Sequence, residues 1–347
     1  MRIFRRSFLA LALSVFAWLH GPIHAQVPAT PASMVVGVIK ASNVRGDVRR
    51  VNLANLAEAP LQNGDTLTQD NAIVTGTGES SAVLVFANGS TVRVGHTSRI
   101  EIKEFLMDPL QADVPSVAAL TREPTKSRTN LRLEYGEMVG NVKTLNHADG
   151  STFSVSTPAG AAGIRGTTFR IVYRPTGNGQ AFNFQLSTAE GVVVFQGTTA
   201  IGRTEVPVVV GREVSFTATI DPADNSLVIS PPGGGPGTGP GGGPRDLPPS
   251  EPISGEAMAA LQDATVQIIQ VQQQTRFTQV EVQSMPAAPS STTPQGTPAQ
   301  PGQPGQPAQP GAANSTTPTL APTRPAETQR PPTPAAFPPR TTPGDGR

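Results

Sequence analysis

The chain has 347 residues, a formal net charge of +1 and no cysteine. This near-neutral balance excludes the basic footprint of a nucleic-acid-binding protein, and the absence of thiols excludes disulfides, thiol catalysis and a cysteine-linked lipid anchor. The 35 glycines and 36 prolines gather in a few segments, so only part of the chain has the composition of a globular domain.

The first 25 residues have the pattern of an export signal. Three arginines precede an apolar run over residues 8–19, and the small residue Ala25 ends the segment. We predict a signal peptide over residues 1–25, cleaved between Ala25 and Gln26. The apolar run is shorter than the about 20 residues of a spanning helix, which disfavours an uncleaved anchor. The Arg5-Arg6 pair leaves both general and twin-arginine export open, and we expect the mature chain in the periplasm or at the cell surface of a Gram-negative-type bacterium.

Residues 34–230 have the apolar patterning of one β domain. Short runs such as 91–94 and 99–103 alternate apolar and polar residues, 192–195 is continuously apolar, and turn signals such as Asn88-Gly89 separate the runs. A period of two predicts strands. About a dozen such runs predict an all-β fold, built as a sandwich, a barrel or an irregular solenoid.

The rest of the chain is predicted to contain one helix between two disordered segments. Residues 231–252 are nearly pure proline and glycine and predict a linker, and residues 286–347 predict a disordered Pro-rich tail. Residues 253–285 place apolar side chains at spacings of four and three, which predicts one amphipathic helix. Two interpretations stay open: the helix packs back onto the β domain, or it binds a partner or a second copy of the chain.

The residues that could carry chemistry do not form a known constellation. Only His96 and His147 remain outside the predicted signal peptide, neither in a metal-ligand spacing, and no Gly-x-Ser-x-Gly motif is present. Two pairs of aspartates lie near turns, where their side chains typically cap backbone N–H groups: Asp65 with Asp70, and Asp221 with Asp224. We predict a protein that is not an enzyme and that has no cofactor or metal site.

The most distinctive segment is Thr-Pro-Ala-Gly-Ala-Ala-Gly-Ile-Arg-Gly-Thr-Thr-Phe at residues 157–169. Its glycines permit positive φ or close backbone approach, and Pro158 fixes φ, so the segment predicts a tight corner between two strands. Arg165 is its single charged residue. It could bind an anion or a partner carboxylate, or it could bridge strand-end carbonyls; because no second basic group is near, we favour the structural role.

Together with four other segments, this motif resembles the FecR-domain family. The other segments are Gly64-Asp-Thr-Leu67, Ala82-Val-Leu-Val-Phe-Ala-Asn-Gly-Ser-Thr-Val-Arg-Val94, Leu133-Glu-Tyr-Gly-Glu137 and Leu186-Ser-Thr-Ala-Glu-Gly-Val-Val-Val194. The resemblance covers residues 64–216 and implies an all-β, partly solenoid-like periplasmic module without catalytic residues. Its structural signature in this chain consists of Pro158, Gly160, Gly163, Arg165, Gly166, Thr167 and Phe169.

Classical FecR-type regulators join a cytoplasmic anti-sigma segment and a membrane helix to the periplasmic domain. This chain opens with a predicted signal peptide instead, so it resembles stand-alone exported FecR-domain proteins. We expect a non-enzymatic envelope protein whose domain is a protein-interaction or scaffold module for an unidentified envelope partner. The alternatives are sigma-factor signalling through an uncleaved anchor or a partner subunit, and cell-wall or carbohydrate binding. The single tryptophan, Trp18, lies in the predicted signal, which disfavours carbohydrate binding.

Overall fold

The computed structural model describes residues 34–176, 181–230 and 246–287, all of which belong to a unit spanning residues 1–291. A second unit, residues 292–347, and the predicted signal peptide lie outside the described residues.

The described part is mostly β, as predicted. Its strands are β1 (Val35–Val36), β2 (Ile39–Arg45), β3 (Val48–Asn52), β4 (Glu58–Pro60), β5 (Thr66–Leu67), β6 (Asn71–Thr75), β7 (Ser81–Phe86), β8 (Thr91–Val94), β9 (Ser98–Met107), β10 (Ser127–Asn141), β11 (Thr152–Thr157), β12 (Gly160–Thr176), β13 (Ala181–Thr199), β14 (Gly202–Val209), β15 (Arg212–Ile220), β16 (Leu227–Ile229) and β17 (Glu251–Pro252). Its helices are α1 (Gly255–Gln274), α2 (Gln279–Gln283) and the short 3-10 helices η1 (Val117–Ala119) and η2 (His147–Asp149).

The hydrogen-bonded pairs sort the main strands into two layers. Layer A has the spatial order β2, β7, β8, β10, β12, β13, β15. Layer B has the order β3, β6, β9, β10, β11, β12, β13, β14. The long strands β10, β12 and β13 belong to both layers, and the pairing network closes on itself. The arrangement therefore combines two of the predicted architectures: two packed layers, as in a sandwich, that the long strands join into one closed barrel.

Each long strand passes from one layer to the other at a glycine with positive φ. These are Gly136 in β10 (φ +103°), Gly166 in β12 (φ +62°) and Gly191 in β13 (φ +74°). The β12–β13 register shifts between Arg165 and Thr168, which is the signature of a β-bulge. A positive φ is costly for residues with a Cβ, so glycine allows these three strands to change layer.

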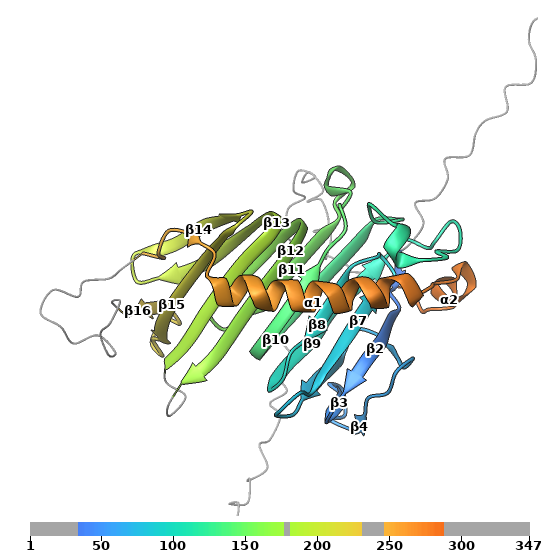
Figure 1. Ribbon diagram of the computed structural model, residues 1–347, viewed down its shortest axis with the longest axis horizontal. Coiled ribbons are helices and arrows are strands. Elements are labelled where there is room, and N and C mark those ends of the chain that lie inside the picture. The colour runs from blue at the N-terminus through green and yellow to red at the C-terminus, as the bar shows by residue number, and fades with distance from the viewer. Residues whose placement is uncertain (1–33, 177–180, 231–245, 288–347) are drawn as a thin grey trace, which may run out of the picture. The chain divides into compact units, whose positions relative to one another are not determined.

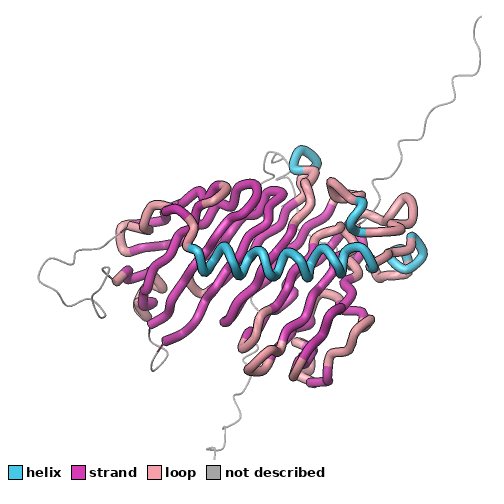
Figure 2. The backbone as a smooth tube through the Cα atoms, in the orientation of Figure 1, coloured by secondary structure: helices cyan, strands magenta, loops and turns pink. Residues whose placement is uncertain are grey.

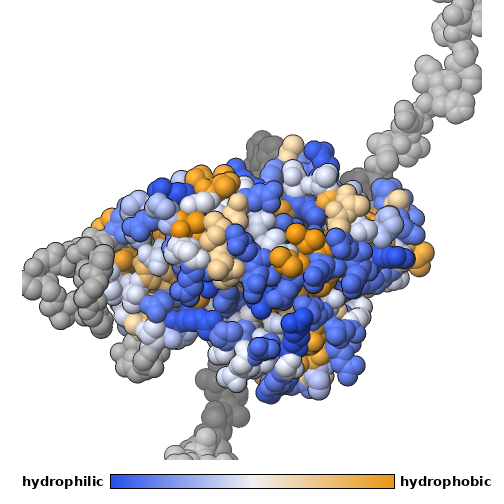
Figure 3. Space-filling model, viewed as in Figure 1, coloured by the Kyte–Doolittle hydropathy of each residue, from blue (hydrophilic) through white to orange (hydrophobic). Residues whose placement is uncertain are grey.

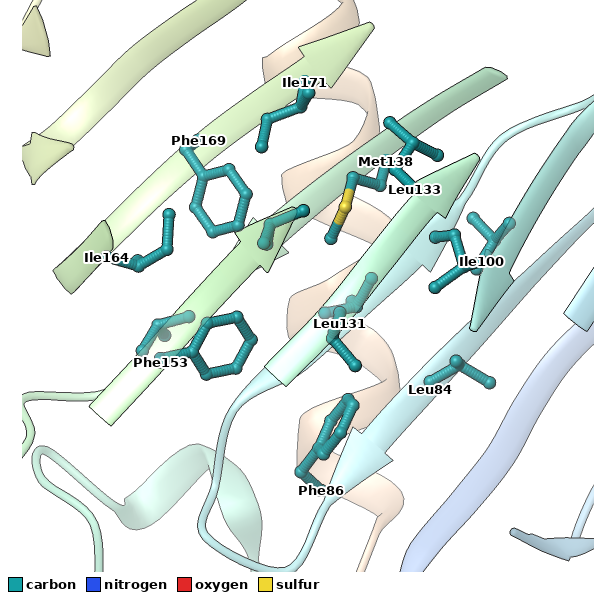
Figure 4. Close-up of a cluster of buried hydrophobic side chains, with 14 of the residues drawn as sticks. Leu84, Phe86, Ile100, Leu131, Leu133, Met138, Phe153, Ile164, Phe169 and Ile171 are labelled. Atoms are coloured by element: carbon teal, nitrogen blue, oxygen red, sulfur yellow. The ribbon is translucent and has the colours of Figure 1, made fainter. Parts of the chain in front are cut away.

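The core lies between the two layers and is rich in phenylalanine. The Phe86 ring of β7 packs edge-on against Phe105 of β9, with centroids 5.1 Å apart, and near Phe153 of β11 at 6.3 Å. Phe184 and Phe195, from the two halves of β13, stack at 4.5 Å. Figure 4 shows part of this core, in which Phe86 and Phe153 lie among leucine and isoleucine side chains. Burying each such ring stabilises the fold by about 1.5–3 kcal/mol.

Helix α1 packs on the outer face of layer A, as the first of the two interpretations of its apolar stripe expects (Figures 1 and 2). Leu261, Ala264 and Ile268 form a buried cluster with Val139 of β10. Near the other end, the Gln272 side-chain amide donates to Thr91 Oγ1 and Asn141 Oδ1, both at 3.0 Å. The helix begins at a capping serine, because Ser254 Oγ accepts a hydrogen bond from the Ala257 N–H.

The predicted helix over 253–285 is broken after Gln274. The Phe277 N–H and carbonyl both pair with the backbone of Val114, at 3.0 and 2.8 Å, and the Phe277 side chain is fully buried. Two backbone hydrogen bonds and a buried aromatic ring outweigh the gain from continuing an exposed helix. The chain therefore resumes helical structure only at α2.

The predicted linker over 231–252 also ends earlier than expected. Residues 231–245 lie outside the described residues, but β17 pairs with β15 and the Leu247 side chain is 6% exposed. Leu247 fits above Gly197, where an added Cβ would lie 3.1 Å from its Cδ1. Burial of one leucine in this glycine-lined site anchors a segment whose composition otherwise resembles a linker.

Candidate interaction surface

The distinctive segment 157–169 forms a β-hairpin and then a strand that crosses between the layers. The tight corner lies at Pro158-Ala159, between β11 and β12. Thr157 Oγ1 accepts from the Ala159 N–H and donates to the Gly160 carbonyl, both at 3.1 Å, which closes the turn. The corner is therefore shorter than predicted, because residues 160–169 are already in β12.

Four of the signature residues have a structural role in or next to the hairpin, either as buried side chains or as glycines with positive φ. Thr167 and Phe169 are buried, and the Phe169 ring lies over Gly140 in the core (Figure 4). Gly160 has φ +146° and Gly166 has φ +62°, so both need glycine. Gly163 has no positive φ and lies exposed, with only the Val194 carbonyl oxygen, 3.9 Å away, near an added Cβ. Its conformation does not require glycine.

The Arg165 side chain is exposed on β12. It makes no ion pair and no hydrogen bond with any residue that the structure describes, so the expected bridge to strand-end carbonyls is not found. The reason is strand alternation: Ile164 points into the core, which turns its neighbour Arg165 outward. Arg165 is a surface residue on a rigid strand.

Arg165 lies at one corner of a regular outward-facing surface on layer B. The cross-strand pairs align three outward residues on each of β12, β13 and β14, while the alternating residues between them are buried. We call this surface the Arg165 face. It consists of Ala161, Gly163 and Arg165 on β12, Val192, Val194 and Gln196 on β13, and Glu205, Pro207 and Val209 on β14.

The Arg165 face combines exposed apolar side chains with few charges. Val192 is 36% exposed and Val209 is 45% exposed, and the two residues pair with each other at one end of the β13–β14 register. Nearby, the same layer is charged: Arg99 pairs with Glu134 at 2.6 Å and Arg128 with Glu104 at 3.2 Å. Exposed valines beside glycine and proline form a flat apolar surface, which is the composition expected at the centre of a protein contact.

The sequence alone does not identify most of this surface. The run Val192-Val-Val-Phe195 is apolar throughout, yet the structure exposes Val192 and buries Val193 and Phe195. A continuous apolar run carries no periodicity that could show which side is free. The burial pattern becomes visible only through pairing with β12, in which Ala162 and Ile164 are buried while Gly163 and Arg165 are exposed.

The outer face of layer A carries a polar network. Arg170 donates to Glu137 Oε1 at 2.8 Å and to Gln185 Oε1 at 2.6 Å, and Gln185 in turn donates to Glu213 at 3.1 Å. Burial by itself would raise the pKa of Glu137, but the hydrogen bond and charge of Arg170, with smaller contributions from Arg174 and Arg93, hold this pKa below its usual value. The network is an internally paired structural element.

The other residues that could carry chemistry act in turns. Asp221 accepts from the Ala223 N–H at 2.8 Å and Asp224 from the Ser226 N–H at 2.9 Å, so both cap a turn as predicted. Asp65 also accepts a backbone hydrogen bond, from the Gln62 N–H. Asp70 lies in a turn with φ +67°, but its side chain makes none of the described capping hydrogen bonds. His147 contacts the Ser151 carbonyl oxygen at 3.1 Å, and His96 is exposed. In the described ranges no group of three or more His, Asp or Glu side chains could hold a metal ion.

The face that bears α1 is mainly hydrophilic, and its hydrophobic residues form separate patches (Figure 3). On α1 itself, Val266 and Ile269 are about half exposed, at 56% and 46%. Among helices of the described residues, none has the length and hydrophobicity needed to cross a bilayer.

Comparison with known families identifies the β region. Residues 71–198 match the family whose description is FecR protein. The chain carries a FecR domain. The match begins at β6 and ends within β13, so it contains all three layer-crossing glycines and the hairpin with Arg165. Strand β14, which completes the Arg165 face, lies just beyond it.

Two solved structures are similar to part of the chain. Both are crystal structures, at 1.65 and 2.50 Å resolution, of a candidate anti-sigma factor from Parabacteroides distasonis ATCC 8503. Each is 11% identical, has a TM-score of 0.27, and is covered over 58% of its length by 45% of this chain. The chain thus spans less than two thirds of that protein. No curated protein matches the chain.

Proposed function

We propose that this chain is a non-enzymatic protein of the cell envelope whose FecR domain binds another protein through the Arg165 face. The observation that carries the proposal is the pattern of exposure in β12 to β14, where Arg165, Val192 and Val209 face outward from a well-packed layer. A strand with a buried side normally presents polar side chains on its other side. Exposed valines in register with Arg165 of the segment 157–169 favour a contact surface.

The rigidity of this surface supports the same function. The residues between those of the face, such as Ile164, Val193 and Val208, are at most 1% exposed and fix the three strands against the core. A surface held in this way loses little conformational entropy when it binds. The arginine supplies specificity, because an exposed guanidinium can form a bidentate pair with a partner carboxylate.

The envelope location in this proposal rests on the sequence of residues 1–25. Intact-mass measurement of the protein purified from its host should give an N-terminus at Gln26. A chain that retains Met1 would contradict the cleaved signal peptide. That result would favour the second candidate, a signalling component with an N-terminal anchor, which the FecR match also supports.

Affinity capture from envelope extracts tests the binding function. The full mature chain should retain a protein that is lost with Val192→Asp, since a charge buried within an apolar contact is costly to desolvate. Val228→Asp is the matched control, because Val228 is 44% exposed but lies on β16, outside the Arg165 face. Equal capture by both variants would refute the assignment of the surface, and no capture by the unmodified chain would count against a binding function.

A further inference from the structure

The nine residues of the Arg165 face form three rows across the strands. One outer row is Ala161, Gln196, Glu205; the middle row is Gly163, Val194, Pro207; the other outer row is Arg165, Val192, Val209. The two charges of the face, Arg165 and Glu205, therefore occupy diagonally opposite corners. The other diagonal runs from Ala161 through Val194 to Val209 and carries no charge.

We propose that the Arg165 face binds the same face of a second copy of this chain, with Arg165 of each copy opposite Glu205 of the other. This inference rests on the proposed function, because it names the partner of that same surface. In a two-fold symmetric contact, residue i of one copy meets residue j of the other, and residue j meets residue i. A surface can pair with itself when its opposite charges exchange places under the two-fold rotation.

The uncharged diagonal is the line that makes this exchange possible. Rotation by half a turn about the line through Ala161, Val194 and Val209 places the second copy face to face with the first. Arg165 then lies over Glu205 of the second copy, so two ion pairs form. Val192 meets Pro207, which joins two apolar groups. Gly163, which has no side chain, meets the longer Gln196 side chain of the second copy.

The charges at the two corners are available for this contact. Arg165 has no partner among the described residues, and Glu205 is exposed and accepts one hydrogen bond, from Gln196 Nε2 to its Oε1 at 2.7 Å. Across the same layer, by contrast, Arg99, Arg128 and Arg132 already pair with glutamates of their own chain. The charges that remain to pair with a second copy are therefore those of the Arg165 face, and not those of the strands that carry Arg99, Arg128 and Arg132.

The features of β14 favour contact through the face and not through the strand edge. Among the described strands, β14 pairs only with β13, so its other edge is open. It carries Arg203, Glu205 and Pro207, and charged residues and proline on an edge strand hinder the addition of another strand. A second copy therefore meets the flat side of β12 to β14.

The size of the surface sets the strength of the contact. Nine residues are fewer than the about 20–30 residues that each partner contributes to an interface of standard size. The dimer is accordingly weak and forms in a concentration-dependent equilibrium. Its two ion pairs lie at corners of the contact, where salt screens them, so high ionic strength should weaken it further.

Analytical ultracentrifugation of the full mature chain over a concentration series tests the inference. We expect a monomer–dimer equilibrium that weakens in 1 M salt. Arg165→Glu and Glu205→Arg should each lower the association constant at least tenfold, because like charges then face each other twice. The double variant R165E/E205R should restore association. Arg276→Glu is the matched control, since it reverses an exposed charge between α1 and α2, outside the Arg165 face, and should leave association unchanged.

A chain that is monomeric throughout the series, or a double variant that associates no better than the single ones, would overturn the inference. Melting curves of all variants by circular dichroism show that a lost dimer is not lost folding. The proposed function fails separately. If the chain is monomeric but Val192→Asp still abolishes capture of a different envelope protein, the second-copy inference is wrong and the interaction surface stands.

Discussion

Replacing Gly166 by alanine tests whether a positive-φ glycine lets β12 pass between the layers. At φ +62° the left-handed conformation costs an alanine about 1–2 kcal/mol. The added Cβ would also lie 3.3 Å from Thr144 Cα, a backbone atom that cannot rotate away. Alanine loses less entropy than glycine on folding, which offsets part of the cost. The net expectation is a loss of about 1–3 kcal/mol in the free energy of unfolding.

Gly163→Ala is the matched control for this prediction. It makes the same chemical change three residues earlier in the same strand, at an exposed position without positive φ and with 3.9 Å to the nearest atom. Its free energy of unfolding should change by less than about 0.5 kcal/mol, or rise slightly.

Urea unfolding followed by far-ultraviolet circular dichroism measures both variants, since the only tryptophan is Trp18 in the predicted signal. For a domain of this size, the Gly166 variant should melt about 2–4 °C lower for each kcal/mol lost. Equal losses in the two variants would refute the role of positive φ. A larger loss at Gly163 would show that the outward position is the constrained one.

Three further predictions concern the helix, the polar network and Arg165. Leu261→Ala should lower the free energy of unfolding, measured in urea, by about 2–5 kcal/mol, because Leu261 is buried against layer A. Val266→Ala, on the exposed side of α1, should change it by less than about 0.5 kcal/mol. Similar losses in the two variants would mean that the helix does not pack as described. Because the folded-state pKa of Glu137 is lowered, its ion pair stabilises the fold above the unfolded-state value of about 4.3 and loses this effect as pH falls through the lower folded-state value. Glu137→Gln should therefore be less stable than the parent at pH 7, and the difference should shrink as pH falls below the unfolded-state pKa of about 4.3. A constant difference would exclude this linkage. Arg165→Ala should change stability by less than about 0.5 kcal/mol, and a loss above 1 kcal/mol would restore the structural role that the exposed side chain argues against.

The prediction of the fold from sequence succeeded where a single strand carries its own signal. The alternation in 99–103 and the turn at Asn88-Gly89 fix strands and a hairpin without reference to the rest of the chain. The family resemblance added the order of the segments, and the match over 71–198 confirms it. The helix over 253–285 was found with its apolar stripe, but its break was not, because the break depends on pairing between Phe277 and Val114.

By itself, the sequence determined the β character, the positions of the glycines and the absence of a recognisable catalytic motif, since these follow from local periodicity and residue type. Only the tertiary structure decided what the glycines do and where Arg165 points. Gly136, Gly166 and Gly191 lie far apart in the chain, yet each marks the point where a strand changes layer. Arg165 faces outward because Ile164 is fixed in a core built from both layers, and the Arg165 face exists because register aligns β12, β13 and β14. Register is a property of paired strands, so no single segment of the sequence contains it.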